Sequence, residues 1–237
     1  MTIDPDQNFY DPDYDIDNDI DFTGYTLGYN YYDPRFTQIF ICKRYKLAYV
    51  NSPKNASTTC LHTLGMLQHP ELDDNISTEA IKENGYVQKV TDRSNKLIKF
   101  NILKNKGYKI FTICRNPYSR VVSDYRFEYK TGVLVQRHIT FEDYIGRIES
   151  RKFGYMTIRN CTQWDNFLMD KVDELIRYEN FVEEFKEKIL DPIGVDIELP
   201  VLQYGGKYNY RDYYNEDLKE RVYNLYKIDI DNLGYKF

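Results

Sequence analysis

Residues 45–59 read YKLAYVN followed by SPKNASTT, a short apolar run that passes directly into a polar loop and a row of hydroxyl residues. The first seven residues are rich in strand-forming types, and residues 57–68 have the composition of a helix. Segment 52–56 therefore connects a strand to a helix N-terminus. Such an N-terminus offers unpaired backbone N–H groups and a partial positive charge, which favour a phosphate.

Lys54 adds a point charge to this loop, and Ser57, Thr58 and Thr59 add hydroxyl donors. The nucleotide-triphosphatase pattern GxxxxGK[ST] is absent, because the lysine comes early and the loop contains no glycine. This argues against ATP or GTP hydrolysis. Taken alone, a capped helix beside an exposed Lys54 explains the loop equally well.

Two further strand signals follow the first, at residues 108–114 (YKIFTIC) and 174–178 (ELIRY). Helix signals separate and follow them, at residues 77–85, 117–130, 141–149, 180 onward and 215–229. Strands separated by helices predict an α/β fold, a P-loop-like parallel β-sheet flanked by helices. Ligands of such sheets bind beyond the carboxyl ends of the strands.

Charge divides the chain of 237 residues unevenly. Residues 1–34 hold nine Asp and no Lys, Arg or Glu, which leaves 28 acidic against 32 basic residues in the remainder. We interpret residues 1–33 as an acidic arm, and residues 34–237 as one domain with a mildly basic surface that suits an anionic ligand.

The four cysteines show no metal-ligand spacing and are expected to be buried free thiols. No apolar run approaches the length of a membrane span, and no signal peptide is visible. We expect a soluble, cytoplasmic protein.

The second candidate element follows residues 108–114 and reads RNPYSRVVSDY at residues 115–125. Arg115 lies at the carboxyl end of the predicted strand, beside the same crevice as Lys54. Ser123 lies eight residues later, on the predicted helix. A guanidinium and a hydroxyl together form a good clamp for a phosphate monoester.

In this order the two elements resemble the sulfotransferases that use 3′-phosphoadenosine-5′-phosphosulfate (PAPS), especially the carbohydrate sulfotransferase branch. SPKNAST at residues 52–58 is similar to that family's 5′-phosphosulfate loop, often PKxAST, and RNPYSRVVSDY is similar to its 3′-phosphate motif. Weaker similarity continues at Gln163, Trp164 and Phe167, at residues 176–181 and at residues 210–214. The resemblance covers about residues 40–237.

The resemblance implies a sulfotransferase fold and PAPS as donor, with PAP (adenosine 3′,5′-bisphosphate) as product. Lys54 would stabilise the leaving group, and Arg115 with Ser123 would bind the 3′-phosphate. Lys207, in a Gly-Gly-Lys loop, is a further candidate for covering the nucleotide. The family requires no metal. The residues that would hold the 5′-phosphosulfate are Asn55, Ala56, Ser57, Thr58 and Thr59.

A general base for the acceptor hydroxyl is not assigned by the sequence. His62 and His69 lie on the helix that follows the loop, and Glu83 lies in the variable region where the acceptor would bind. His138 and Asp92 are further alternatives.

The acceptor class that the resemblance favours is a glycan, and we expect no nucleic-acid partner. Alternatives are sulfation of a protein tyrosine or a small molecule, a nucleotide kinase-like phosphotransferase, and a catalytically inactive protein that binds PAP.

Overall fold

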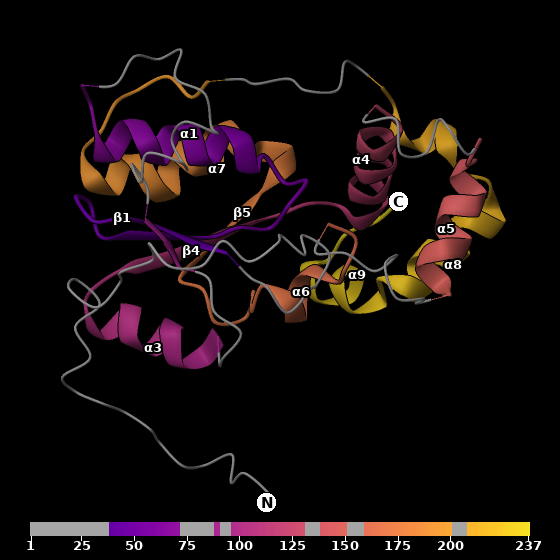
Figure 1. Cartoon of the computed structure of the whole chain (residues 1–237), viewed down its shortest axis with the longest axis horizontal. Coiled ribbons are helices and arrows are strands. Elements are labelled where there is room, and N and C mark those ends of the chain that lie inside the picture. The colour runs from indigo at the N-terminus through magenta and orange to yellow at the C-terminus, as the bar shows by residue number, and fades with distance from the viewer. Residues whose placement is uncertain (1–37, 72–87, 91–95, 131–137, 151–158, 201–207) are drawn as a thin grey trace, which may run out of the picture. The chain divides into compact units, whose positions relative to one another are not determined.

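The computed structural model describes residues 38–71, 88–90, 96–130, 138–150, 159–200 and 208–237, which form a mixed sheet flanked by helices (Figure 1). The sheet has five strands in the order β3-β1-β2-β4-β5. The central strand β2 pairs parallel with β4, and β4 pairs parallel with β5. The strands are β1 (Ile39–Cys42), β2 (Leu47–Val50), β3 (Gln88–Val90), β4 (Lys109–Cys114) and β5 (Glu174–Arg177).

The predicted α/β fold is thus confirmed, and the three predicted strands are β2, β4 and β5. The structure adds β1, which pairs antiparallel with β2, and β3, which pairs antiparallel with β1 at the edge of the sheet. Because β1 and β2 are antiparallel, a short turn joins them and no crossover helix is needed between them.

Helices cover both faces of the sheet, with α1 and α7 on one face and α3, α6 and α9 on the other (Figure 1). The α-helices are α1 (Ser57–Gln68), α3 (Lys96–Asn105), α4 (Pro117–Lys130), α5 (Phe141–Glu149), α6 (Gln163–Asn166), α7 (Phe181–Phe185), α8 (Glu216–Leu225) and α9 (Lys227–Leu233). Shorter helical turns are η2 (Tyr178–Asn180), η3 (Lys186–Leu190), η4 (Asp191–Ile193) and η5 (Tyr210–Tyr213).

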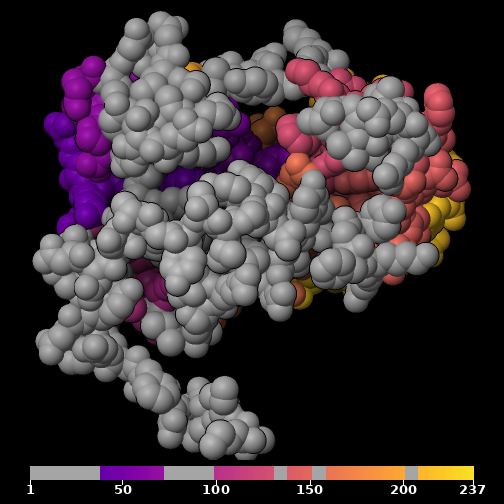
Figure 2. Space-filling model, in the orientation of Figure 1, coloured from indigo at the N-terminus to yellow at the C-terminus, as the bar shows by residue number. Residues whose placement is uncertain are grey.

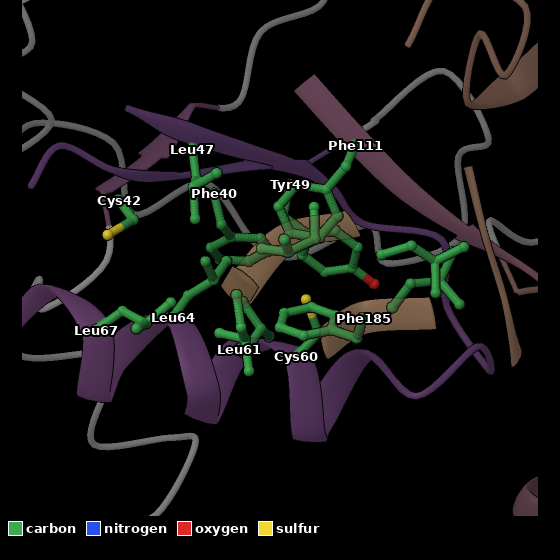
Figure 3. Packing of buried hydrophobic residues seen from close by; sticks show 14 of the residues in the cluster. Phe40, Cys42, Leu47, Tyr49, Cys60, Leu61, Leu64, Leu67, Phe111 and Phe185 are labelled. Carbon is green, nitrogen blue, oxygen red and sulfur yellow. The ribbon is translucent and has the colours of Figure 1, made fainter. Parts of the chain in front are cut away.

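Alternation along the strands explains why both faces are covered. Successive strand residues point to opposite faces. Phe40 and Tyr49 pack against Leu64 of α1 in one buried cluster (Figure 3). Their neighbours Ile41 and Val50 belong to a second cluster, which includes residues of α3. Full burial stabilises each large apolar side chain by roughly 1.5–3 kcal/mol, so both layers hold the sheet.

A third buried cluster joins α4, α5 and α8 beyond one end of the strands (Figure 1). Figure 2, in the same orientation, shows the surface of α1 on the left and that of α5 on the right. The start of α5 is a capping box: Thr140 Oγ1 accepts from the Asp143 backbone amide at 3.1 Å, and the Thr140 backbone amide donates to Asp143 Oδ2 at 3.0 Å. Asn116 caps the start of α4, because its Oδ1 accepts from the Tyr118 backbone amide at 3.0 Å.

The helix predicted from residue 180 onward is α7, with Asn180 as its N-cap residue. The Asn180 side chain makes no capping hydrogen bond and donates to Glu184 instead. One predicted helix boundary is wrong. The helix predicted over residues 215–229 is interrupted at Tyr226, where φ is −119°. The Tyr226 ring is buried and its hydroxyl donates to the Asn160 carbonyl at 2.6 Å. The helix predicted over residues 77–85 and the acidic arm lie outside the described residues, so the arm's separation from the domain stays a prediction.

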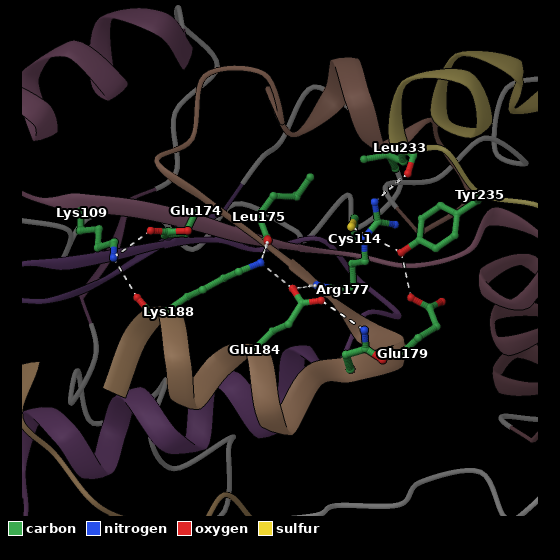
Figure 4. Close-up of polar contacts among 11 residues, drawn as sticks. Lys109, Cys114, Glu174, Leu175, Arg177, Glu179, Glu184, Lys188, Leu233 and Tyr235 are labelled. Atoms are coloured by element: carbon green, nitrogen blue, oxygen red, sulfur yellow. Dashed lines mark hydrogen bonds and ion pairs between the residues drawn. The ribbon is translucent and has the colours of Figure 1, made fainter. Parts of the chain in front are cut away.

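Polar contacts tie the C-terminal segment to the ends of the two parallel strands β4 and β5 (Figure 4). The Arg177 guanidinium donates to the Leu233 carbonyl at 2.9 Å, and the Tyr235 hydroxyl donates to Glu179 at 2.8 Å. Glu179 also accepts from the Asn116 amide at 2.8 Å. Helix α9 and the residues that follow it therefore hold the end of β4, which Arg115 directly follows, and the end of β5.

All four cysteines are buried free thiols, as predicted. Within the described residues, none of the helices combines the length and the apolar character that crossing a membrane requires.

Candidate functional site

The two motifs meet because their strands are parallel neighbours. Val50 at the end of β2 pairs with Thr112 of β4, so the chain leaves both strands at the same edge of the sheet. The Lys54 loop, residues 51–56, follows β2 and leads into α1, and Arg115 follows β4 directly. This edge is where α/β sheets bind their ligands.

The backbone of the Lys54 loop adopts left-handed conformations without glycine. Lys54 has φ of 71° and Ala56 has φ of 56°. A non-glycine residue pays roughly 1–2 kcal/mol for this conformation, and such strain concentrates at functional turns. Ala56 is also the N-cap of α1 and caps it with no side-chain hydrogen bond. The first turn of α1 holds no acidic residue, so its amides are suited to an anion.

Asn55 holds this loop against the sheet. Its side chain is fully buried, and its Nδ2 lies 2.7 Å from Ser52 Oγ, 2.8 Å from the Ile113 carbonyl oxygen and 2.7 Å from Gln163 Oε1. The side chain therefore points into the protein, and only the backbone of Asn55 is left for the predicted ligand contact.

Among the predicted hydroxyl donors, Ser57 and Thr58 are half-buried in the first turn of α1, whereas Thr59 is buried. Ser57 and Thr58 thus keep the exposure that ligand contact needs. The predicted roles of Ala56, Ser57, Thr58 and Thr59 stay predictions.

The Arg115 guanidinium is fixed on every side. Its Nη1 donates to the Lys54 carbonyl at 2.9 Å, and its Nε and Nη2 donate to Ser119 Oγ at 3.0 and 2.8 Å. Nη2 also donates to the Tyr208 hydroxyl at 3.2 Å, and the guanidinium carbon lies 4.0 Å from the centre of the Tyr178 ring. Arg115 is only 5% exposed, so a charged group is buried among neutral partners.

Three contacts of Arg115 were not predicted from the sequence: Ser119, Tyr178 and Tyr208. Ser119 and Ser123 are four residues apart on α4 and lie on the same face, one turn from each other. The i+4 spacing from Arg115 to Ser119 to Ser123 was a readable signal. Ser123 is half-buried, and its predicted contact with a phosphate stays a prediction. Tyr208 carried no local signal, because it comes to Arg115 from 93 residues away.

Arg120, in the same motif, has a structural role. It is 1% exposed and donates to the Pro53 carbonyl at 3.2 Å and to the Cys161 carbonyl at 2.6 Å. It therefore ties the Lys54 loop to the segment before α6.

The Lys54 amine lies 4.0 Å from the centre of the Phe127 ring on α4. Burial lowers the pKa of Lys54 from 10.5 to about 8, against the opposing pull of the Asp124 carboxylate. In the described part of the chain, neither Lys54 nor Arg115 forms an ion pair with a carboxylate. Asp124 and Glu128 pair with Arg159 instead. A buried and a half-buried cation without paired carboxylates are costly unless an anion joins them.

The candidate bases differ in their burial and in their position along α1. His62 is 4% exposed on α1, and its Nδ1 has no hydrogen-bond partner among the described residues. His69 ends α1, about 18 Å along the helix axis from Ser57 at 1.5 Å per residue. It lies 3.0 Å from Glu71, so the geometry gives no support to His69 as the base.

His138 is exposed in a turn before α5. Glu83, Asp92 and Lys207 lie outside the described residues, and their roles stay predictions. Across the described ranges, no three His, Cys, Asp or Glu side chains gather as they would around a metal ion.

Comparison with known proteins assigns the chain to a family. No curated protein and no solved structure matches it. The sequence profile described as the sulfotransferase family matches residues 37–193, a range that contains the Lys54 loop, Arg115 and the whole sheet. The chain belongs to the sulfotransferase family.

Proposed function

We propose that the protein transfers a sulfuryl group from PAPS to a hydroxyl of a carbohydrate acceptor. One observation carries the donor side of this proposal. Lys54 and Arg115 are cations without ion-pair partners in the described ranges, and the Arg115 guanidinium donates to the Lys54 backbone carbonyl at 2.9 Å, at one edge of the sheet. A ligand with anionic groups at two separated positions satisfies both, and PAPS carries a 5′-phosphosulfate and a 3′-phosphate.

The Lys54 loop suits the 5′-phosphosulfate, because its left-handed backbone leads directly to the uncapped first turn of α1. Arg115 suits the 3′-phosphate, because a rigid guanidinium recognises phosphate oxygens by its fixed geometry. An exclusively 5′-phosphorylated nucleotide would leave this second cation unused. The pair therefore favours PAPS over ATP, and a sulfotransferase over a nucleotide kinase.

The reaction would be an in-line displacement at sulfur. A bond forms between the acceptor oxygen and sulfur, the bond from sulfur to the bridging oxygen breaks, and PAP leaves with that electron pair. The acceptor proton passes to a base. The Lys54 ammonium offsets the negative charge that develops on the leaving oxygen, and the loop orients the group that is transferred.

Carbohydrate hydroxyls are the proposed acceptor because the two motifs resemble the carbohydrate branch of the family. A tyrosine or small-molecule acceptor, and a protein that binds PAP without turnover, are the alternatives. They are separated by experiment in two steps.

The first step measures thermal stabilisation of the full chain by PAP, AMP, ADP and ATP at equal concentration. We expect PAP to raise the melting temperature more than the others. Equal stabilisation by PAP and ADP would contradict the assignment. The second step follows the release of PAP from PAPS with glycan, tyrosine-peptide and phenol acceptors. PAP binding without turnover on any of them would favour the inactive binding protein.

A further inference from the structure

The side-chain amide of Gln163, at the start of α6, connects the two motifs from inside the protein. It is fully buried. Its Oε1 accepts from Asn55 Nδ2 at 2.7 Å and from the Arg115 amide at 3.0 Å, and its Nε2 donates to the Arg115 carbonyl at 2.8 Å. Both backbone polar groups of Arg115 and the side chain of Asn55 are thus held by one amide group.

Gln163 is itself fixed by Asp229 of α9. Asp229 is fully buried. Its carboxylate accepts from the backbone N–H of Gln163 at 2.7 and 2.8 Å and from the backbone N–H of Trp164 at 2.8 Å. Burial raises the pKa of Asp229, which the hydrogen bonds from these amides oppose. A buried carboxylate is costly, and among the described residues Asp229 accepts its hydrogen bonds from the start of the four-residue α6.

Strain in the Lys54 loop explains why the buried hydrogen bonds of Gln163 are needed. Asn55 lies between the left-handed residues Lys54 and Ala56, and strained backbone persists only where its surroundings over-determine it. The 2.7 Å bond from Asn55 to Gln163 is one of three contacts that do so. The same amide group sets the direction in which Arg115 leaves β4.

We propose that Gln163 is a positioning residue for nucleotide binding. Gln163 fixes the position of the Lys54 loop relative to Arg115, and Asp229 positions Gln163. This inference rests on the proposed function. Gln163 is assigned no contact with the ligand and acts through Asn55 and Arg115. The alternative is a buried polar group that contributes stability alone.

Binding of two nucleotides separates these readings. PAP and AMP differ only in the 3′-phosphate, so the ratio of the AMP Kd to the PAP Kd measures what Arg115 contributes. Lost stability lowers both affinities together, whereas a misplaced Arg115 lowers the ratio. The measurement is isothermal titration calorimetry on the full chain, at a temperature where melting curves show each variant folded.

We expect Gln163→Met, which keeps the length but not the hydrogen bonds, to lower the ratio by about tenfold or more. Gln163→Glu keeps the acceptor oxygens and loses the donor to the Arg115 carbonyl, so a smaller fall is expected. Asp229→Asn should lower the ratio in the same direction. The matched control is Thr112→Val, which removes another buried hydrogen bond, from Thr112 Oγ1 to the Val50 carbonyl at 2.7 Å, without touching either motif.

An unchanged ratio in folded Gln163→Met, or an equal fall in Thr112→Val, would overturn the positioning role. If Gln163→Met does not fold, the ratios of Gln163→Glu and Asp229→Asn decide by the same criterion. A wild-type ratio near one would overturn the proposed function and this inference with it. A wild-type preference for PAP that survives in the Gln163 variants overturns the inference alone.

Discussion

The Arg115 guanidinium donates to the backbone carbonyl of Lys54 at 2.9 Å, across 61 positions of sequence. This bond joins the two motifs into one site, because it fixes the Arg115 guanidinium against the backbone of the Lys54 loop. The Lys54 carbonyl turns towards Arg115 in a residue whose φ is 71°. The left-handed conformation and the joining of the motifs thus occur at the same residue.

Lys54→Ala is expected to lower turnover by about 100-fold while retaining part of the PAP affinity, because the Lys54 charge acts most strongly on the leaving oxygen in the transition state. Steady-state kinetics and calorimetry on the same samples measure the two effects. Lys171→Ala, at an exposed lysine paired with Asp170, is the control. Unchanged turnover would remove Lys54 from the mechanism.

PAP affinity is expected to weaken as pH rises through about 8, the pKa to which burial lowers Lys54. Above this pH the free protein holds Lys54 neutral, and binding of an anion must take up a proton. The Kd should then rise by up to about tenfold per pH unit, while the phosphates of PAP, with a second pKa near 6, stay fully charged. Titrations from pH 7 to 9.5 measure this slope. The slope should vanish in Lys54→Ala, and an equal slope there would assign the titration to another group.

Arg115→Lys is expected to weaken PAP binding nearly as much as Arg115→Ala, by about 10- to 100-fold, because an ammonium cannot reproduce the planar fork held by Ser119 and Tyr208. AMP affinity should change little in either variant. Ser119→Ala should give a smaller loss, since it frees the guanidinium without removing its charge. Equal losses for PAP and AMP would indicate that Arg115 supports the fold and not the 3′-phosphate.

Ala56→Gly is expected to stabilise the protein by up to about 1 kcal/mol, because it relieves the left-handed backbone at φ of 56°. Ala48→Gly, in the middle of β2 at a fully buried position, is the matched control and should destabilise by about 1–2 kcal/mol. Denaturant unfolding measures both. Destabilisation by Ala56→Gly would mean that the loop is not strained there.

Local patterns were sufficient to predict β2, β4 and β5, and the helices α1, α4 and α5, because each depends on neighbouring residues alone. Strand β1 was missed although its four residues, IFIC, are apolar. A short apolar run has no period that separates a strand from a buried helical turn. The break at Tyr226 was missed for a different reason, since it depends on burial against a distant segment.

The opening stretch, residues 45–59, determined by itself that a strand passes through a polar turn into a helix, and together with the motif at residues 115–125 it predicted the family. Only the tertiary structure decided how the two come together. It assigned the Asn55 side chain to the interior, placed Ser119 and Tyr208 on Arg115, and left His69 at the far end of α1. The reason is physical: strand and cap signals arise within a few residues, whereas the direction of the buried Asn55 side chain is set by a partner that folding brings from 108 residues away.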